Sequence, residues 1–171
     1  MFGKFILREV LGEGSTGIVH RATDTISNTN IALKILRPEI TERIGYERLR
    51  LQTALMAQLK DPRVIPVKET GMCDGKLWIS MPLLEKGSLE ANVSPLQAEE
   101  VCRITKDIAS GLEFIHARGL LHLDLKPANI FYGEKNLMLA DFANSYRKCL
   151  TKHLSTGRQA HIRSEWSFKK F

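Results

Sequence analysis

The sequence predicts an α+β fold in which strands joined by short turns come first and helices follow. Residues 5–36 hold three runs of strand-forming residues separated by glycines and other turn residues. Residues 39–60 and 94–118 repeat apolar side chains at helical spacing. A chain of 171 residues is long enough for one domain with its own hydrophobic core.

Composition points to a water-soluble domain. Apolar residues make up 43% and charged residues 26%, as is usual for such domains. No apolar run approaches the ~20 residues that span a bilayer, and the N-terminus lacks a signal-peptide core. Cys73, Cys102 and Cys149 lie far apart without paired histidines. We therefore expect a cytoplasmic protein with reduced thiols, no transmembrane segment and no cysteine metal site.

The net charge of +6 is concentrated at the C-terminal end. Residues 1–143 carry 18 basic and 18 acidic side chains, which cancel, whereas residues 144–171 carry seven basic side chains and one acidic one. Such a tail can meet acidic partners or membranes, but a solvated helix face explains it more simply. We expect no specific nucleic-acid partner.

The first two strands flank a glycine-rich turn. A strand is predicted over residues 5–11, the turn reads Gly-Glu-Gly-Ser-Thr-Gly over residues 12–17, and a second strand follows to residue 24. A dinucleotide-binding fingerprint would need a helix after the glycines, and a Walker loop would need Lys-Ser/Thr. Strand, glycines and strand instead predict a hairpin flap whose bare backbone can approach phosphates.

One lysine stands in the third predicted strand. Residues 31–36 place apolar side chains on both sides of Lys34, as a strand would whose lysine points into a cleft between two parts of the molecule. A helix is predicted over residues 39–60, with a stripe of Leu49, Leu55, Met56 and Leu59, and Asp61-Pro62 ends it.

A second helix is predicted over residues 94–118. Ser94 is the expected N-cap, Pro95 the first helical residue and Gly119 the terminator. The side chains expected to face inward are Val101, Ile104, Ile108, Leu112 and Ile115. Before this helix a strand is predicted over residues 76–80.

Residues 122–130 bring together the groups that phosphoryl transfer requires. Asp124 supplies a carboxylate, Lys126 a cation and Asn129 an amide oxygen within one turn, and Pro127 fixes the backbone between the last two. A hairpin follows over residues 131–140, and it ends in Asp141-Phe142-Ala143.

Residues 122–130 resemble the catalytic loop of serine/threonine protein kinases, His-x-Asp-Leu-Lys-Pro-x-Asn. Residues 31–34 resemble that family's third strand, residues 55–67 the end of its first long helix and its fourth strand, and residues 141–143 its Asp-Phe-Gly motif. The resemblance covers residues 5–143. It implies a protein-kinase-like two-lobe fold within a single domain of residues 1–171. We expect an antiparallel N-lobe over about 1–83, an abbreviated, mainly helical C-lobe over about 84–143 and an atypical basic tail over 144–171.

The resemblance also implies the roles of individual residues. Asp124, Lys126 and Lys34 would be catalytic, and Asn129 and Asp141 would hold Mg²⁺, with Mn²⁺ as a substitute. The ATP-binding residues would be Leu11, Gly12, Glu13, Gly14, Ser15, Thr16, Gly17, Val19, Ala32, Lys34, Met81, Pro82, Leu84 and Phe131. The vertical stack of apolar side chains between the lobes would consist of Val67, Met56, Phe142 and His122. A protein Ser/Thr hydroxyl would be the substrate, and an activating protein partner is expected.

Four departures from the family pattern complicate this interpretation. Gln52 falls where the helix glutamate should pair with the strand lysine, and Glu47 lies about 140° away on the helix. Ala143 replaces a glycine, and Leu123 replaces an arginine that reads a phosphate. We therefore expect activity to be independent of phosphorylation at Ser145, Thr151, Ser155 or Thr156.

The fourth departure is that no Ala-Pro-Glu segment follows residue 143; helices are predicted over residues 144–154 and 159–171 instead. Three interpretations stay open: a minimal serine/threonine kinase, an ATP-binding pseudokinase or interaction module, and an inactive truncated kinase. A secreted effector acting in a host cytosol fits the first.

Overall fold

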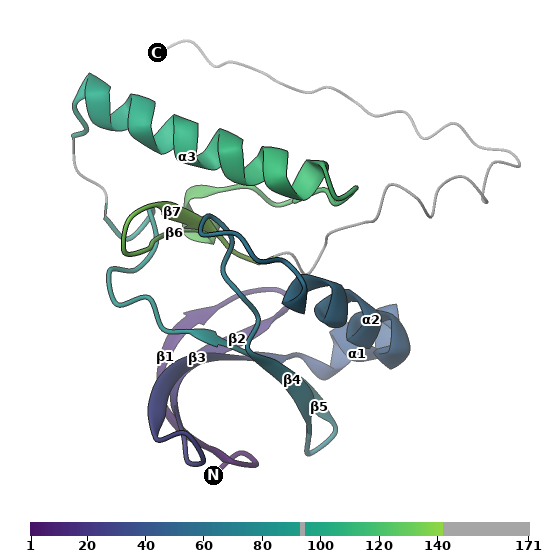
Figure 1. Ribbon diagram of the computed structural model, residues 1–171. Coiled ribbons are helices and arrows are strands. Elements are labelled where there is room, and N and C mark those ends of the chain that lie inside the picture. Colours follow the sequence, from purple (N-terminus) through teal and green to yellow (C-terminus); the bar gives the residue numbers. More distant parts are fainter. Residues whose placement is uncertain (93–94, 142–171) are drawn as a thin grey trace, which may run out of the picture.

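The computed structural model describes residues 1–92 and 95–141, which form a curled β-sheet with two short helices and, across from it, a long helix on a small hairpin (Figure 1). This is the α+β architecture predicted from the sequence. The basic tail and its two expected helices lie outside the described residues. No helix in the described ranges is long and apolar enough to cross a bilayer.

The sheet contains five antiparallel strands in the order β1-β2-β3-β5-β4. They are β1 (Phe5–Glu13), β2 (Gly17–Asp24), β3 (Thr29–Leu36), β4 (Glu69–Cys73) and β5 (Lys76–Pro82). The strand predictions for residues 5–11, 18–24, 31–36 and 76–80 are confirmed. The expectation of a fourth strand before residue 67 is wrong. In that segment Val64 makes only a single bridge, to Leu139, and β4 begins later, at Glu69.

Strand register sorts the side chains between the two faces of the sheet. Val19 and Ile79 are both paired with Lys34, and Ala32 is paired with Met81, so these side chains share the face turned toward the helical part. The alternate residues Leu33 and Ile35 face the other side. The lysine predicted on the cleft side therefore lies there.

The predicted single helix over residues 39–60 is two helices, α1 (Pro38–Ile44) and α2 (Tyr46–Ala57). Gly45, with φ +89°, separates them, because glycine adopts a backbone conformation that interrupts the helical ladder. Leu49, Met56 and Leu59 of the predicted stripe are buried.

The long helix α3 spans Ala98–His116, and its first helical residue lies three positions after the predicted Pro95. Gln97, not Ser94, is its N-cap, and Gly119 follows its end with φ +73°, as a helix-terminating glycine does. Ile104 and Ile115 are buried as predicted, but Val101 is 45% exposed. Val101 lies in the first turn of α3, before the helix reaches the hairpin it packs on.

Two short strands, β6 (Ile130–Tyr132) and β7 (Leu137–Leu139), form the predicted hairpin beneath α3. The one-turn helix η1 (Pro127–Asn129) precedes β6. Backbone bonds join the hairpin to the segment before β4: Leu139 N–H donates to Arg63 and Ile65 N–H donates to Leu139. One apolar cluster, including Met56, Leu59, Val64, Ile115 and Leu139, spans this junction.

Candidate active site

Lys34 and Asp141 meet between the sheet and the hairpin. Lys34 Nζ lies 2.6 Å from Asp141 Oδ1, although 107 residues separate them in the sequence. Lys34 belongs to β3, which has a strand on either side, and is 7% exposed. Asp141 follows β7 by two residues. The two strands therefore direct an amine and a carboxylate into one cleft.

The cleft behind this ion pair is mostly apolar. Its walls come from α2, the segment before β4, β5 and the end of the hairpin, with Gln52, Met56, Val67, Ile79, Met81 and Ala140 among the lining residues. Gln52 therefore lies on the wall that also holds Lys34, where the family pattern places a glutamate. Glu47 does not substitute for that glutamate, since it pairs with Arg50 on the exposed side of α2.

The loop of residues 122–130 folds around the Asp124 carboxylate. Asn129 Nδ2 donates to Asp124 O at 2.8 Å and to Asp124 Oδ2 at 3.1 Å. Lys126 Nζ lies 2.9 Å from the same Oδ2. The hydrogen bond from Lys126 is the main reason why the pKa of Asp124 is below its usual value, and it raises the pKa of Lys126 in return. Asp124 is therefore held as a carboxylate at neutral pH.

The two expected metal ligands, Asn129 and Asp141, lie on backbone segments that are hydrogen-bonded to each other. Ala140 N–H donates to the carbonyl of Asn129 at 2.9 Å, which ties the residue before Asp141 to Asn129. Since the Asn129 amide nitrogen faces Asp124, its oxygen is left to accept. A carboxylate and an amide oxygen suit Mg²⁺, which typically takes only one or two protein carboxylates together with substrate phosphates. No cluster of three acidic, histidine or cysteine ligands exists among residues 1–92 and 95–141, so phosphates would have to complete the metal shell.

His122 supports the loop from inside. It is 3% exposed, and burial lowers the pKa of its imidazole, against the opposing effects of the Ala140 backbone and of the Asp141 and Asp124 charges. His122 is therefore a neutral packing residue near pH 7.

Two residues of the site have strained backbones. Leu123 has φ +63° and Asp141 has φ +59°. Aspartate tolerates the left-handed region, but leucine rarely enters it. Such strain persists where the surrounding structure enforces it, and it concentrates at functional sites. The sequence pattern marked the unusual Leu123 but gave no sign of its backbone conformation.

The glycine-rich turn is held from below by Arg37, a residue that sequence reasoning missed. Arg37 Nε donates to the Gly14 carbonyl at 3.2 Å, its backbone N–H donates to Thr16, and its guanidinium pairs with Glu13. Gly17 is required by packing, because a Cβ there would lie 2.4 Å from Ile35 O. At Gly12 a Cβ would meet nothing within 4 Å. Arg37 stands before a proline, where no local pattern indicates this contact.

The residues expected around adenine come from both parts of the molecule. Val19, Ala32 and Met81 share the cleft face of the sheet. Phe131 of β6 is half-buried and bridged to Ser88 of the segment that follows β5, residues 83–92, which we call the linker. Pro82, the last residue of β5, and Leu84 of the linker are half-buried, while Leu11 near the end of β1 is 44% exposed. Phe142 and Ala143 lie outside the described residues, as do Ser145, Thr151, Ser155 and Thr156, where phosphorylation is expected to leave activity unchanged.

An ion-pair network joins the sheet to the linker. Arg21 of β2 donates to both carboxylate oxygens of Glu85, at 2.9 and 2.7 Å, and also lies 2.6 Å from Glu9 of β1. Bidentate arginine pairs fix geometry more firmly than single contacts do. Sequence reasoning missed this network as well, because its members are far apart in the chain.

Comparison with known proteins identifies the class to which this fold and site belong. Residues 5–159 match the protein kinase domain family, so the chain belongs to the protein kinase family. The resemblance seen in the catalytic loop, the third strand and the Asp141 motif is thereby confirmed at the level of the family.

Among its relatives are mycobacterial serine/threonine-protein kinases. PknH of Mycobacterium tuberculosis is 32% identical over 134 residues, which are 76% of this chain and 21% of PknH. PknE of the same species is 31% identical over 146 residues, 82% of this chain and 26% of PknE. The crystal structure of the M. tuberculosis PknI kinase domain superposes with a TM-score of 0.70 at 29% identity, covering 84% of this chain and 59% of that domain. The chain thus spans about a fifth to a quarter of the length of PknH and PknE.

Proposed function

We propose that this chain binds ATP with a divalent cation in the cleft and transfers the γ-phosphate to a serine or threonine hydroxyl of a protein. The observation that carries the proposal is the convergence of Lys34 and Asp141, 2.6 Å apart, close to the loop that holds Asp124, Lys126 and Asn129. These are a phosphate-binding amine, two oxygen ligands, a carboxylate and a second cation, the set that phosphoryl transfer uses.

Each residue has a distinct task in this proposal. Lys34 would hold the α- and β-phosphates, and Asn129 and Asp141 would hold Mg²⁺, which when bound neutralises charge on the phosphates. Asp124, kept ionised by Lys126, would accept or orient the hydroxyl proton. Lys126 would then lie against the transferring phosphate, which requires its present contact with Asp124 to loosen.

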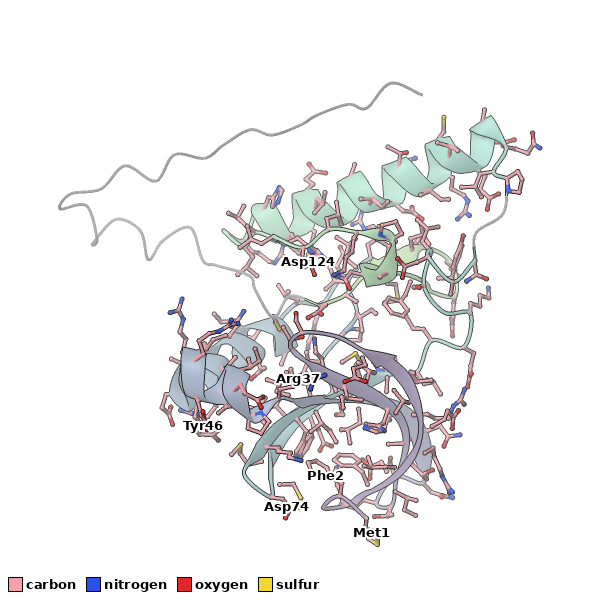
Figure 2. All side chains as sticks on the ribbon, turned by 180° about the vertical axis from the view of Figure 1, so that it is seen from behind. Met1, Phe2, Arg37, Tyr46, Asp74 and Asp124 are labelled. Carbon is pink, nitrogen blue, oxygen red and sulfur yellow. The ribbon has the colours of Figure 1, made fainter. Side chains whose placement is uncertain are left out.

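The test is transfer of radiolabelled phosphate from [γ-³²P]ATP to a generic basic protein. Asp124→Asn should reduce the rate by about 10²–10⁴-fold, since it removes the proton acceptor. Asp74→Asn is the matched control, because Asp74 is an exposed turn residue at the far end of the sheet from Asp124 (Figure 2). Equal rates in wild type and Asp124→Asn would contradict the proposal.

A second candidate is an ATP-binding protein that does not transfer phosphate. It is favoured by Gln52, which gives α2 a neutral amide on the cleft wall, and by the ion pair between Lys34 and Asp141, which occupies the expected metal ligand. Thermal shift with Mg²⁺-ATP, combined with the transfer assay, distinguishes the two. A rise in melting temperature without any transfer by the wild type would support this candidate over the first.

We also propose an activating protein partner, because α2 carries the neutral Gln52 where the family pattern places the glutamate that pairs with the strand lysine. Transfer should then rise when an extract from the cell in which the protein acts is added. No rise at any extract concentration would contradict a requirement for a partner.

A further inference from the structure

A hollow opens on the face of the sheet that is turned away from Lys34. Leu7, Ile18, His20 and Ile35 share this face, because Ile18 is paired with Ile35, His20 with Leu33 and Leu7 with Ala22. Phe2, from the segment before β1, is part of the same hollow. Its volume is about 290 Å³, close to the lower end of the range for small-molecule sites.

Three basic side chains and no carboxylate line this hollow. Apolar walls from Phe2, Leu7, Ile18 and Ile35 meet His20, Arg37 and Lys76. Within the described ranges, Lys76 has no carboxylate within ion-pair distance, and the buried Nδ1 of His20 has no hydrogen-bond partner. A buried polar atom without a partner is unusual in a folded protein and calls for an explanation. An anionic group at this point would supply one.

Arg37 connects the hollow to the glycine-rich turn. It contributes to the wall of the hollow while it also holds the Gly14 and Thr16 carbonyls and pairs with Glu13. Figure 2 labels Phe2 and Arg37 in the part of the molecule that holds the sheet, and Asp124 in the helical part. An anion in the hollow would compete with Glu13 for the guanidinium.

We propose that this hollow binds a small amphiphilic carboxylate, with its apolar body among Phe2, Leu7, Ile18 and Ile35 and its head group near His20, Arg37 and Lys76. The volume corresponds to about ten water molecules at the roughly 30 Å³ that each occupies in the liquid, and we take it to fit a ligand of about ten non-hydrogen atoms. Octanoate has this size. The occupant acts on the glycine-rich turn by drawing Arg37 away from Glu13, and this second step rests on the proposed binding of ATP under that turn.

The test is a two-dimensional NMR titration of the full chain with octanoate, below its micelle concentration and without nucleotide. The expected result is saturable one-to-one binding with shifts in β1, β2 and β3. Lys76→Glu should weaken it by about tenfold or more, the effect of one favourable charged contact. Lys60→Glu is the matched control, since Lys60 is exposed and lies outside the hollow. Octan-1-ol, which lacks the charge, should bind more weakly than octanoate.

Leu7→Trp gives an independent variant that fills the apolar part of the hollow, and its binding should be lost while its amide spectrum stays folded. Absence of saturation by the wild type, or equal affinity in wild type, Lys76→Glu and Leu7→Trp, would overturn the site.

ATP affinity measured with and without saturating octanoate tests the second step. We expect octanoate to weaken ATP binding by about fivefold, and ATP to weaken octanoate binding by the same factor, because coupling between sites is reciprocal. Octanoate binding with unchanged ATP affinity would overturn the coupling through Arg37. Octanoate binding by a chain that fails to bind ATP would count against the proposed function, not against the hollow.

Discussion

The two sides of the cleft are held in place by different kinds of structure. Lys34 lies in β3 with strands on both sides, and its position follows from register with Val19 and Ile79. Asp124 lies in a loop that is followed by a one-turn helix and strands of three residues each, and side-chain hydrogen bonds with Asn129 and Lys126 hold it. The Lys34 side of the cleft is therefore held by the backbone ladder of the sheet, whereas the Asp124 side depends on packing beneath α3. Changes in the helical part should disturb transfer before they disturb the sheet.

The largest effect is expected at Leu139, the buried residue on which the hairpin and α3 meet. It is 1% exposed and packs so closely on Gly111 of α3 that a Cβ there would lie 3.0 Å from Leu139 Cδ1. Leu139→Ala should cost about 2–5 kcal/mol of unfolding free energy. Hydrogen exchange should show the loss of protection over residues 120–141. Leu33→Ala, at an equally buried position of the sheet, should instead reduce protection across β1–β5. The same pattern in both variants would contradict the difference between the two sides.

On the sheet side, a single methyl group should distinguish a packed glycine from an open one. Gly17→Ala should destabilise the chain by about 1–3 kcal/mol, because its Cβ would press on Ile35 O of the neighbouring strand. Gly12→Ala should change stability little, since nothing lies within 4 Å. Urea unfolding of both variants checks this. Equal costs would mean that the β2–β3 contact does not constrain the turn.

On the Asp124 side of the cleft, relief of backbone strain should stabilise the chain. Leu123→Asn places a residue that tolerates φ +63° at an exposed position, and we expect a gain of up to about 1 kcal/mol. Leu125→Asn is the control, because Leu125 is also exposed but has no positive φ. A loss of stability for Leu123→Asn beyond that of Leu125→Asn would show that the leucine side chain, not the backbone, determines stability at this position.

The smallest effect concerns pH and His122. Burial lowers the pKa of His122 below the value of 6.5 expected in the unfolded chain. Between these two pKa values the unfolded state binds more protons than the folded state. The contribution of His122 to the free energy of unfolding is therefore fully present above about pH 6.5 and declines as the pH falls below that value. His122→Phe should flatten this part of the curve of unfolding free energy against pH. An unchanged slope would show that other ionisable groups cause this pH dependence.

The sequence predicted most elements because their signals are local. Strand alternation, the glycine-rich turn, the terminator Gly119 and the hairpin all follow from neighbouring residues. The break at Gly45 was missed although a glycine marks it locally. The N-cap at Gln97 and the late start of β4 were missed because the local preferences there are weak.

For the site, the sequence predicted which residues would converge but not how they would contact one another. Motif spacing indicated that Lys34, Asp124, Asn129 and Asp141 act together. The direct contact of Lys34 with Asp141, the hold of Arg37 on Gly14 and the pairing of Arg21 with Glu85 each join residues distant in the chain. Such contacts depend on how the two parts dock, which no local pattern encodes.

The most direct test of a metal-bound triphosphate in the cleft is ATP affinity by calorimetry, with Mg²⁺ and with EDTA, in the wild type and in Asp141→Asn. The wild type should bind ATP more tightly with Mg²⁺, and Asp141→Asn should lose that increment because an uncharged amide replaces the carboxylate that we propose as a metal ligand. Asp74→Asn should behave as the wild type. An equal gain from Mg²⁺ in the wild type and in Asp141→Asn would contradict the account.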